Sequence, residues 1–98
     1  MAYVAAVRWS ASAGSEQRLE AILAEMAEIT RAEPGCLMYE VHRSVDDAGG
    51  YFLYEQFVDE AAYMLHIDSE HYRRLILGEA LQLLDHRVRR LYGTMAVV

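Results

Sequence analysis

The stretch CLMYEVHRSVDDAGGYFLYEQF, residues 36–57, predicts a β-hairpin. Its first run alternates apolar and polar side chains and puts Tyr39 and Val41 on one face, which is the period of two typical of a strand. The acidic and glycine-rich segment VDDAGG accepts the backbone angles of a tight turn. We therefore expect two antiparallel strands, over residues 36–44 and 51–57.

The residues before this hairpin predict a strand followed by an amphipathic helix. β-prone apolar types dominate residues 3–10, which read YVAAVRWS. A helix is expected over residues 16–31, with Ser15 as its N-cap. Pro34 and Gly35 end this helical region. The apolar residues of the helix recur at i, i+3, i+4, i+7 and i+10 and form one buried stripe: Leu19, Ile22, Leu23, Met26 and Ile29.

The residues after the hairpin predict two helices and a last strand. Asp59 is expected to cap a short helix that runs to about Ile67, and Ser69 to cap the next helix. Gly78 weakens this second helix slightly. Its wide apolar arc comprises Leu75, Ile76, Leu77, Leu81, Leu83 and Leu84. Residues 88–95, VRRLYGTM, predict the fourth strand.

The predicted order βαββααβ favours an α+β fold of the ferredoxin-like, split βαβ type with a four-stranded antiparallel sheet. Residues 1–98 are expected to form a single domain. Apolar residues make up 54% of the chain, which is more than one small core can bury. Because the helices cover one sheet face only, we expect a homodimer through the opposite faces.

The charge and composition exclude several classes of function. A net charge of −6 repels phosphate backbones and anionic membranes, so we expect neither nucleic acid nor membrane as a partner. All nine basic residues are arginine, which excludes Schiff-base and P-loop lysine chemistry. The single cysteine, Cys36, excludes an intrachain disulfide. With no signal-peptide pattern, the expected location is the cytoplasm.

The chain resembles the antibiotic biosynthesis monooxygenase family over nearly its whole length. The most telling elements are the E-P-G-C turn into a strand and the pattern A-x-x-x-H-x-x-S-x-H, formed by Ala62, His66, Ser69 and His71. Three stretches carry the resemblance: EPGCLMYEVHR (33–43), YEQFVDEAAYMLHIDSEHYRRL (54–75) and VRRLY (88–92).

This resemblance implies a dimeric α/β barrel with a pocket between sheet and helices in each protomer. Relatives oxygenate electron-rich phenols, anthrones or quinols with O₂ and use neither metal nor flavin. The chemistry is coherent, because a deprotonated phenol can pass an electron directly to O₂ inside a dry cavity. We therefore expect a small cofactor-independent monooxygenase that acts on an aromatic, polyketide-like phenol or quinol.

Three residues are candidates for catalysis at this pocket. His66 and His71 straddle the predicted break between the two helices, and either imidazole suits a base near neutral pH. Tyr72 stands where relatives carry an aromatic residue and is a candidate wall or proton donor. The simpler alternatives are local hydrogen bonds for the histidines and core packing for the tyrosine.

Three further aromatic residues are candidate walls for a flat substrate: Trp9, Tyr39 and Tyr54. Trp9 lies on the first strand, where packing at the strand end is the simpler alternative. Tyr39 and Tyr54 lie on neighbouring strands and share a face only if the register of those strands allows it.

We expect no metal. Glu40, His42 and Glu55 lie on neighbouring strands and are residue types that can bind a divalent ion. An ion pair of these charges with Arg8 or Arg90 at a dimer interface is the favoured alternative, because buried charges need partners.

Two other functions compete with the monooxygenase. A dimeric binding module would use the same pocket to hold a hydrophobic ligand without turnover. Relatives that bind and degrade haem place asparagine on the first strand, tryptophan at the helix break and histidine on the last helix. Val7, His66 and approximately Ile76 stand there instead, which argues against haem.

Overall fold

The strands and helical segments follow one another along the chain in the predicted order βαββααβ. The structure is a computed structural model and describes residues 1–96. No helix within these residues has the length and apolar character needed to cross a membrane. The elements are β1 (Tyr3–Ala11), α1 (Glu16–Arg31), β2 (Cys36–Arg43), β3 (Gly50–Phe57), α2 (Glu60–Ile67), a π-helical turn η1 (Tyr72–Leu77), a 3₁₀ turn η2 (Ala80–Leu83) and β4 (Leu84–Gly93).

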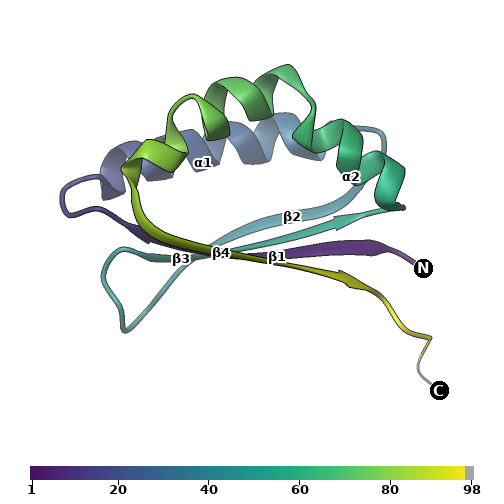
Figure 1. Cartoon of the computed structure of the whole chain (residues 1–98), viewed down its shortest axis with the longest axis horizontal. Helices are drawn as coiled ribbons and strands as arrows, with labels where there is room; N and C mark the ends of the chain where they lie inside the picture. The colour runs from purple at the N-terminus through teal and green to yellow at the C-terminus, as the bar shows by residue number, and fades with distance from the viewer. Residues whose placement is uncertain (97–98) are drawn as a thin grey trace.

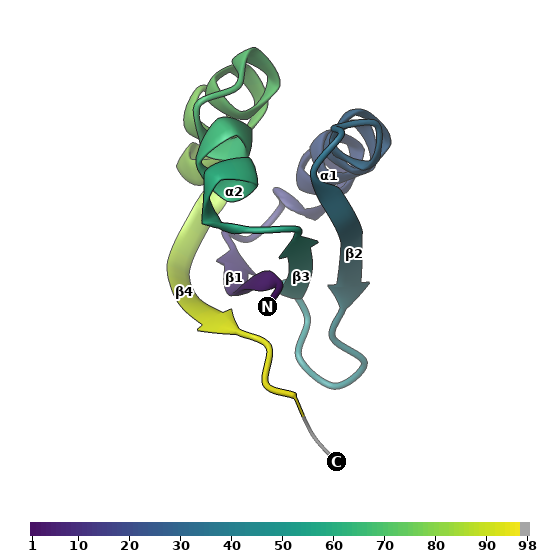
Figure 2. The same cartoon turned by 90° about the vertical axis from the view of Figure 1, so that its right-hand side faces the viewer.

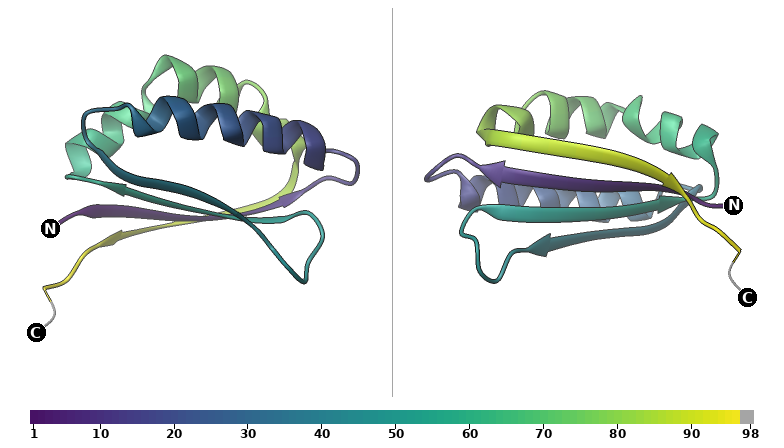
Figure 3. Two further views of the ribbon diagram at one scale, coloured as in Figure 1. Left: turned by 180° about the vertical axis from the view of Figure 1, so that it is seen from behind. Right: turned by 60° about the horizontal axis from the view of Figure 1, so that its bottom comes forward.

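The four strands form one antiparallel sheet in the order β2-β3-β1-β4, which confirms the predicted α+β, ferredoxin-like fold. All helices lie on one face of this sheet, and the other face is bare (Figure 1). Figure 2 shows α1 above the β2 side of the layer and α2 above the β4 side. In Figure 3, the view from behind again shows the helices on one side of the sheet, and the tilted view brings the bare face forward.

The strand register decides which side chains meet the helices. Tyr39 pairs with Glu55, and Glu55 pairs with Ala5, so this row faces the helices together with buried Leu53 and Val7. Alternate rows face the opposite side. One such row runs across all four strands and consists of Glu40, Tyr54, Ala6 and Arg90.

The core lies between the inner sheet face and the helices. The stripe predicted for α1 is confirmed, since Leu19, Ile22, Leu23 and Met26 are all buried and Ile29 is partly buried against the core. Asp59 caps α2 as predicted, because its carboxylate accepts a hydrogen bond of 2.9 Å from the Ala62 amide. The Ser15 side chain, in contrast, makes no capping hydrogen bond to α1.

The prediction was wrong about where the last helix ends and the last strand begins. The helical region breaks at Gly78, whose amide donates to the Arg73 carbonyl five residues back. A Cβ atom at Gly78 would lie 2.5 Å from the Arg74 carbonyl oxygen, so a larger residue would not fit. β4 then starts at Leu84 rather than residue 88, because it pairs with the full length of β1, with Leu84 opposite Ala11.

Gly35 brings the turn before β2 into contact with the start of α2. A Cβ atom there would lie 2.4 Å from the Cβ of Ala62, and the Gly35 carbonyl accepts a 2.9 Å hydrogen bond from Val58. The glycine of the E-P-G-C turn is therefore required by close packing. Its small size sets how near Glu33 lies to α2.

We predict that Gly35→Ala lowers the free energy of unfolding by about 1–3 kcal/mol, because the added methyl group must push α2 away. Chemical denaturation measures the change. Ala62→Gly removes the atom that would clash and by itself costs about 0.5–1 kcal/mol. The double variant should therefore be close in stability to Ala62→Gly alone, and simple additivity of the two losses would contradict the packing argument.

Candidate active site

A cavity of about 350 Å³ lies between the inner sheet face and the chain from α2 to η2. This volume is at the lower end of the range of about 300–1,000 Å³ for small-molecule sites. The lining is aromatic and aliphatic, with one acidic and two basic side chains. It comprises Trp9, Tyr39, Tyr63 and Tyr72; Val7, Leu53, Ile67, Ile76, Leu81 and Val88; and Glu55, Arg87 and Arg89.

The structure brings three of the predicted site residues to this cavity. Trp9, Tyr39 and Tyr72 all line it. Tyr54 does not, which corrects its placement as a wall of the same pocket. Tyr54 pairs with Glu40 on one side and Ala6 on the other, and this row faces away from the helices. Because strand side chains alternate, Tyr39 and Tyr54 lie on opposite faces of the sheet.

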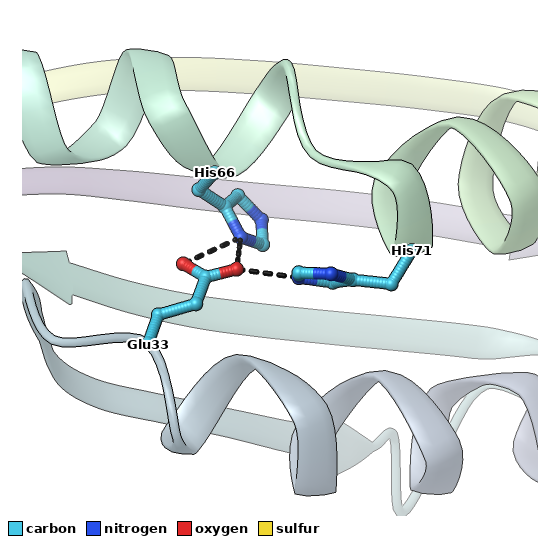
Figure 4. A group of neighbouring side chains, drawn as sticks. All are labelled: Glu33, His66 and His71. Atoms are coloured by element: carbon cyan, nitrogen blue, oxygen red, sulfur yellow. Dashed lines mark hydrogen bonds and ion pairs between the residues drawn. The ribbon is translucent and has the colours of Figure 1, made fainter.

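The two predicted histidines meet at a carboxylate rather than at the mouth of the cavity. Nδ1 of His66 lies 3.0 and 3.2 Å from the two carboxylate oxygens of Glu33, and Nε2 of His71 lies 2.5 Å from Oε2 of the same group. Figure 4 shows the Glu33 carboxylate between the two rings. Neither histidine is part of the cavity lining. The expectation that they border the pocket directly is therefore corrected.

The spacing of the histidine motif is explained by the break between α2 and η1. The Ser69 hydroxyl donates to the carbonyl oxygen of His66 at 2.6 Å and accepts from the Tyr72 amide at 3.2 Å. The same hydroxyl lies 3.2 Å from Nε2 of His71. Ser69 thus ends one helix and begins the next, and it leaves both imidazoles facing the turn that carries Glu33.

Glu55 is the acidic residue of the cavity and the functional candidate that sequence reasoning missed in this role. Its side chain is 8% exposed, and its Oε1 lies 3.6 Å from Nε2 of His66. Burial raises the pKa of Glu55 to about 8, while Arg89 lowers this pKa and Glu33 raises it. A signal for it was present in the sequence, because Glu55 occupies the apolar face of β3 between Leu53 and Phe57.

The three residues considered as metal ligands, Glu40, His42 and Glu55, do not lie together in the structure. Glu40 and His42 are exposed on the outer sheet face, where His42 Nε2 lies 3.6 Å from Glu40 Oε1. Glu55 faces the helices from the other side of the sheet. Because side chains alternate between the two faces of a strand, Glu55 lies on the opposite face of the sheet from Glu40 and His42, although the three lie on neighbouring strands.

Comparison with known proteins assigns the chain to a protein family. The sequence profile described as antibiotic biosynthesis monooxygenase matches residues 2–76. The chain belongs to the antibiotic biosynthesis monooxygenase family. The match includes Glu33, Glu55 and the histidine motif, and it ends before β4, which carries Arg87 and Arg89. No match to this chain is found among curated proteins.

Solved structures share the fold of this antibiotic biosynthesis monooxygenase family member. Rv0793 from Mycobacterium tuberculosis is similar, with a TM-score of 0.91 and 24% identity over 99% of this chain and 98% of its own. PA3566 from Pseudomonas aeruginosa has a TM-score of 0.87 and 27% identity, with coverages of 97% and 95%. A structure described as an antibiotic biosynthesis monooxygenase has a TM-score of 0.88 and 25% identity, with coverages of 98% and 100%.

The cavity of this family member keeps its phenols protonated. Burial raises the pKa of Tyr39 and Tyr72, and it raises that of Tyr63 to about 12. Arg89 donates a 2.9 Å hydrogen bond to the Tyr63 hydroxyl. Burial also lowers the pKa of His66, although the hydrogen bond to Glu33 opposes this effect. At neutral pH the cavity therefore contains neutral tyrosine hydroxyls and one buried carboxyl group, Glu55, whose pKa of about 8 lies close to neutral pH.

Glu33, His66 and His71 are also residue types that occur together at metal sites, and their donor atoms lie within 4.8 Å of one another. Here each of these atoms takes part in a hydrogen bond with another member of the group. Hydrogen bonding accounts for the cluster, so we treat it as a hydrogen-bonded network.

We predict that Glu55 makes stability depend on pH in a direction opposite to that of most carboxyl groups. The folded chain holds a proton on Glu55 up to about pH 8, whereas the unfolded chain releases it near the ordinary value of 4.5. The contribution of Glu55 to stability is therefore lost as pH rises from about 5 to 8.

The measurement is chemical denaturation of wild type and Glu55→Gln at several values between pH 5 and 9. The amide cannot ionise, so the stability of the variant relative to wild type should increase with pH across this interval. Glu28→Gln, at an exposed site on α1, is the matched control and should show no such trend. A constant difference between wild type and Glu55→Gln would show that Glu55 ionises normally.

Proposed function

We propose that this family member is a cofactor-independent monooxygenase that oxidises a small aromatic, polyketide-like phenol or quinol with O₂. The observation that carries the proposal is one buried carboxyl group, Glu55, in a cavity walled by Trp9, Tyr39 and Tyr72. The family assignment supports monooxygenase chemistry. The cavity volume of about 350 Å³ favours a compact ring system over an extended chain.

The reaction needs a base, an anion site and exclusion of water. Removing the hydroxyl proton gives a phenolate, which is electron-rich enough to transfer an electron to O₂. For a simple phenol the balanced reaction is phenol plus O₂ giving quinone plus water. The O–H bond and one ring C–H bond break, the O–O bond breaks, and O₂ takes up four electrons. A preorganised, poorly hydrated cavity lowers the barrier to the charged steps.

Each polar group of the cavity suits one of these steps. The Glu55 carboxylate accepts the substrate proton, because it lines the cavity and the two histidines do not. Arg87 and Arg89 place positive charge beside the phenolate that results. Tyr72 keeps its hydroxyl proton and can donate a hydrogen bond to the substrate, while its ring forms part of the wall.

We also propose that the protein functions as a homodimer through its bare sheet face. This face carries exposed apolar side chains on three of its strands: Met38, Phe52 and Tyr92. It also carries Glu40 on the β2 edge and Arg90 on the β4 edge, so the charges are of opposite sign at opposite edges. A two-fold axis along the strands would place β2 of one copy over β4 of the other and pair these charges.

We predict that static light scattering gives the mass of two copies of the 11.2 kDa chain. Phe52→Glu buries an unpaired charge in the proposed interface and should shift the mass towards one copy. Leu65→Glu, at an exposed position on α2, is the matched control and should leave the mass unchanged. A wild-type mass of one copy at micromolar concentration would exclude this interface.

We predict oxygen uptake with at least one member of a panel of phenols and quinols, measured with an oxygen electrode. The rate should rise with pH through about 8, because Glu55 must lose its proton to act as base. Glu55→Gln should lower kcat by about 10²- to 10⁴-fold. Protein treated with a chelator, with its metal content and visible spectrum checked, should keep its activity.

The control is Glu70→Gln, at an exposed site beside the histidine motif, which should leave kcat unchanged. Tight binding of a phenol without oxygen uptake would favour the binding-module alternative instead. Activity lost with the metal, or a stoichiometric flavin, would contradict the cofactor-independent reaction.

A further inference from the structure

Three titratable side chains, Glu55, His66 and Glu33, follow one another in a row that begins at the cavity. Glu55 lines the cavity, its Oε1 lies 3.6 Å from Nε2 of His66, and Nδ1 of His66 lies 3.0 Å from Oε2 of Glu33. His66 is only 1% exposed, whereas the side chains of Glu33 and His71 are 17% and 16% exposed. His66 is therefore enclosed between a cavity carboxyl and a carboxyl nearer the surface.

The contacts fix which nitrogen of His66 carries hydrogen. An ionised carboxylate only accepts hydrogen bonds, and both oxygens of Glu33 lie within 3.2 Å of Nδ1 of His66. Nδ1 must then carry the hydrogen. A neutral imidazole has a single N–H group, so Nε2 presents a lone pair towards Glu55. His71 donates to Glu33 as well, which holds the carboxylate in this orientation.

The stoichiometry of the proposed reaction requires a temporary site for one proton, and the Nε2 lone pair of His66 can help to provide it. Phenol plus O₂ giving quinone plus water releases no net proton. The proton removed from the substrate at the start must therefore return when the O–O bond breaks and water leaves. A site for that proton close to the cavity and closed to bulk water meets this requirement.

We propose that Glu55 stores the substrate proton in a hydrogen bond to His66, which Glu33 orients. The substrate O–H bond breaks as a Glu55 O–H bond forms, and this O–H group donates to the Nε2 lone pair of His66. O₂ takes an electron from the phenolate and forms a C–O bond to the ring, which gives a peroxide anion. Glu55 returns its proton to the outer oxygen of this peroxide. The ring C–H bond and the O–O bond then break, the C–H proton joins the departing hydroxide as water, and the ring carbon becomes the second carbonyl of the quinone.

The inference rests on the proposed function and makes Glu33 a positioning residue. The separation of 3.6 Å between Glu55 and His66 is longer than a hydrogen bond, and catalytic contacts of this kind tighten when substrate binds. The titratable groups that face His66 from the surrounding elements are Glu33, Tyr39, Glu55, Tyr63, His71 and Tyr72.

The test uses Glu33→Gln, whose amide nitrogen is a donor and so removes the preference for hydrogen on Nδ1 of His66. Nitrogen-15 NMR of the histidine side chains should show the Nδ1–H form of His66 in wild type and its loss in Glu33→Gln. The kcat for a phenol found in the panel should fall about 10²-fold or more, with KM little changed. The rise of activity with pH should move to lower pH, because one negative charge near Glu55 is gone.

Glu33→Asp keeps the carboxylate and should retain the Nδ1–H form with a kcat above that of Glu33→Gln. Glu70→Gln should match wild type in both measurements. If Glu33→Gln fails to fold, Glu33→Asp and the wild-type tautomer decide the question. Hydrogen on Nε2 of His66 in wild type, or full kcat in folded Glu33→Gln, would overturn the proton store. A wild-type protein that oxidises no phenol would instead overturn the proposed function, and the NMR result would still decide the Glu33–His66 arrangement.

Discussion

The structure depends on how one carboxyl group, that of Glu55, is held in an apolar layer. The register of β3 sends this side chain inward with Leu53 and Phe57, where an isolated charge would be very unfavourable. The protein responds in two ways. Burial raises the pKa of Glu55, so that it holds a proton at neutral pH, and the charge of Arg89 opposes this shift and stabilises the ionised form. The cavity and the Glu33 network surround this group.

The network joins parts of the chain that are far apart in sequence. Glu33 follows α1, His66 lies on the last turn of α2, and Glu55 comes from the middle of β3. Gly35 permits the close approach of the first two, because any larger residue would meet Ala62. The E-P-G-C turn and the histidine motif are therefore two halves of one arrangement. Glu33 beside the turn contacts both imidazoles of the histidine motif.

Most of the fold could be predicted because the spacing of apolar residues along each helix and strand indicates which of its faces is buried. The α1 stripe and the hairpin alternation need only local information, and both predictions are confirmed. The site needed the register as well. Without it, Tyr39 and Tyr54 could not be assigned to faces, and Glu55 was grouped with Glu40 and His42 rather than with His66. The start of β4 was missed because it depends on pairing with β1 rather than on the β4 sequence itself.

The proposed reaction requires that a phenol binds in the cavity with its hydroxyl group at Glu55. A crystal structure of the protein grown or soaked with a quinol under anaerobic conditions tests it most directly, because without O₂ the ligand cannot turn over. We expect the aromatic ring among Trp9, Tyr39 and Tyr72, with a hydroxyl oxygen within hydrogen-bond distance of the Glu55 carboxyl. A quinol bound on the outer sheet face beside Tyr54, or in the cavity with both hydroxyls away from Glu55, would contradict it.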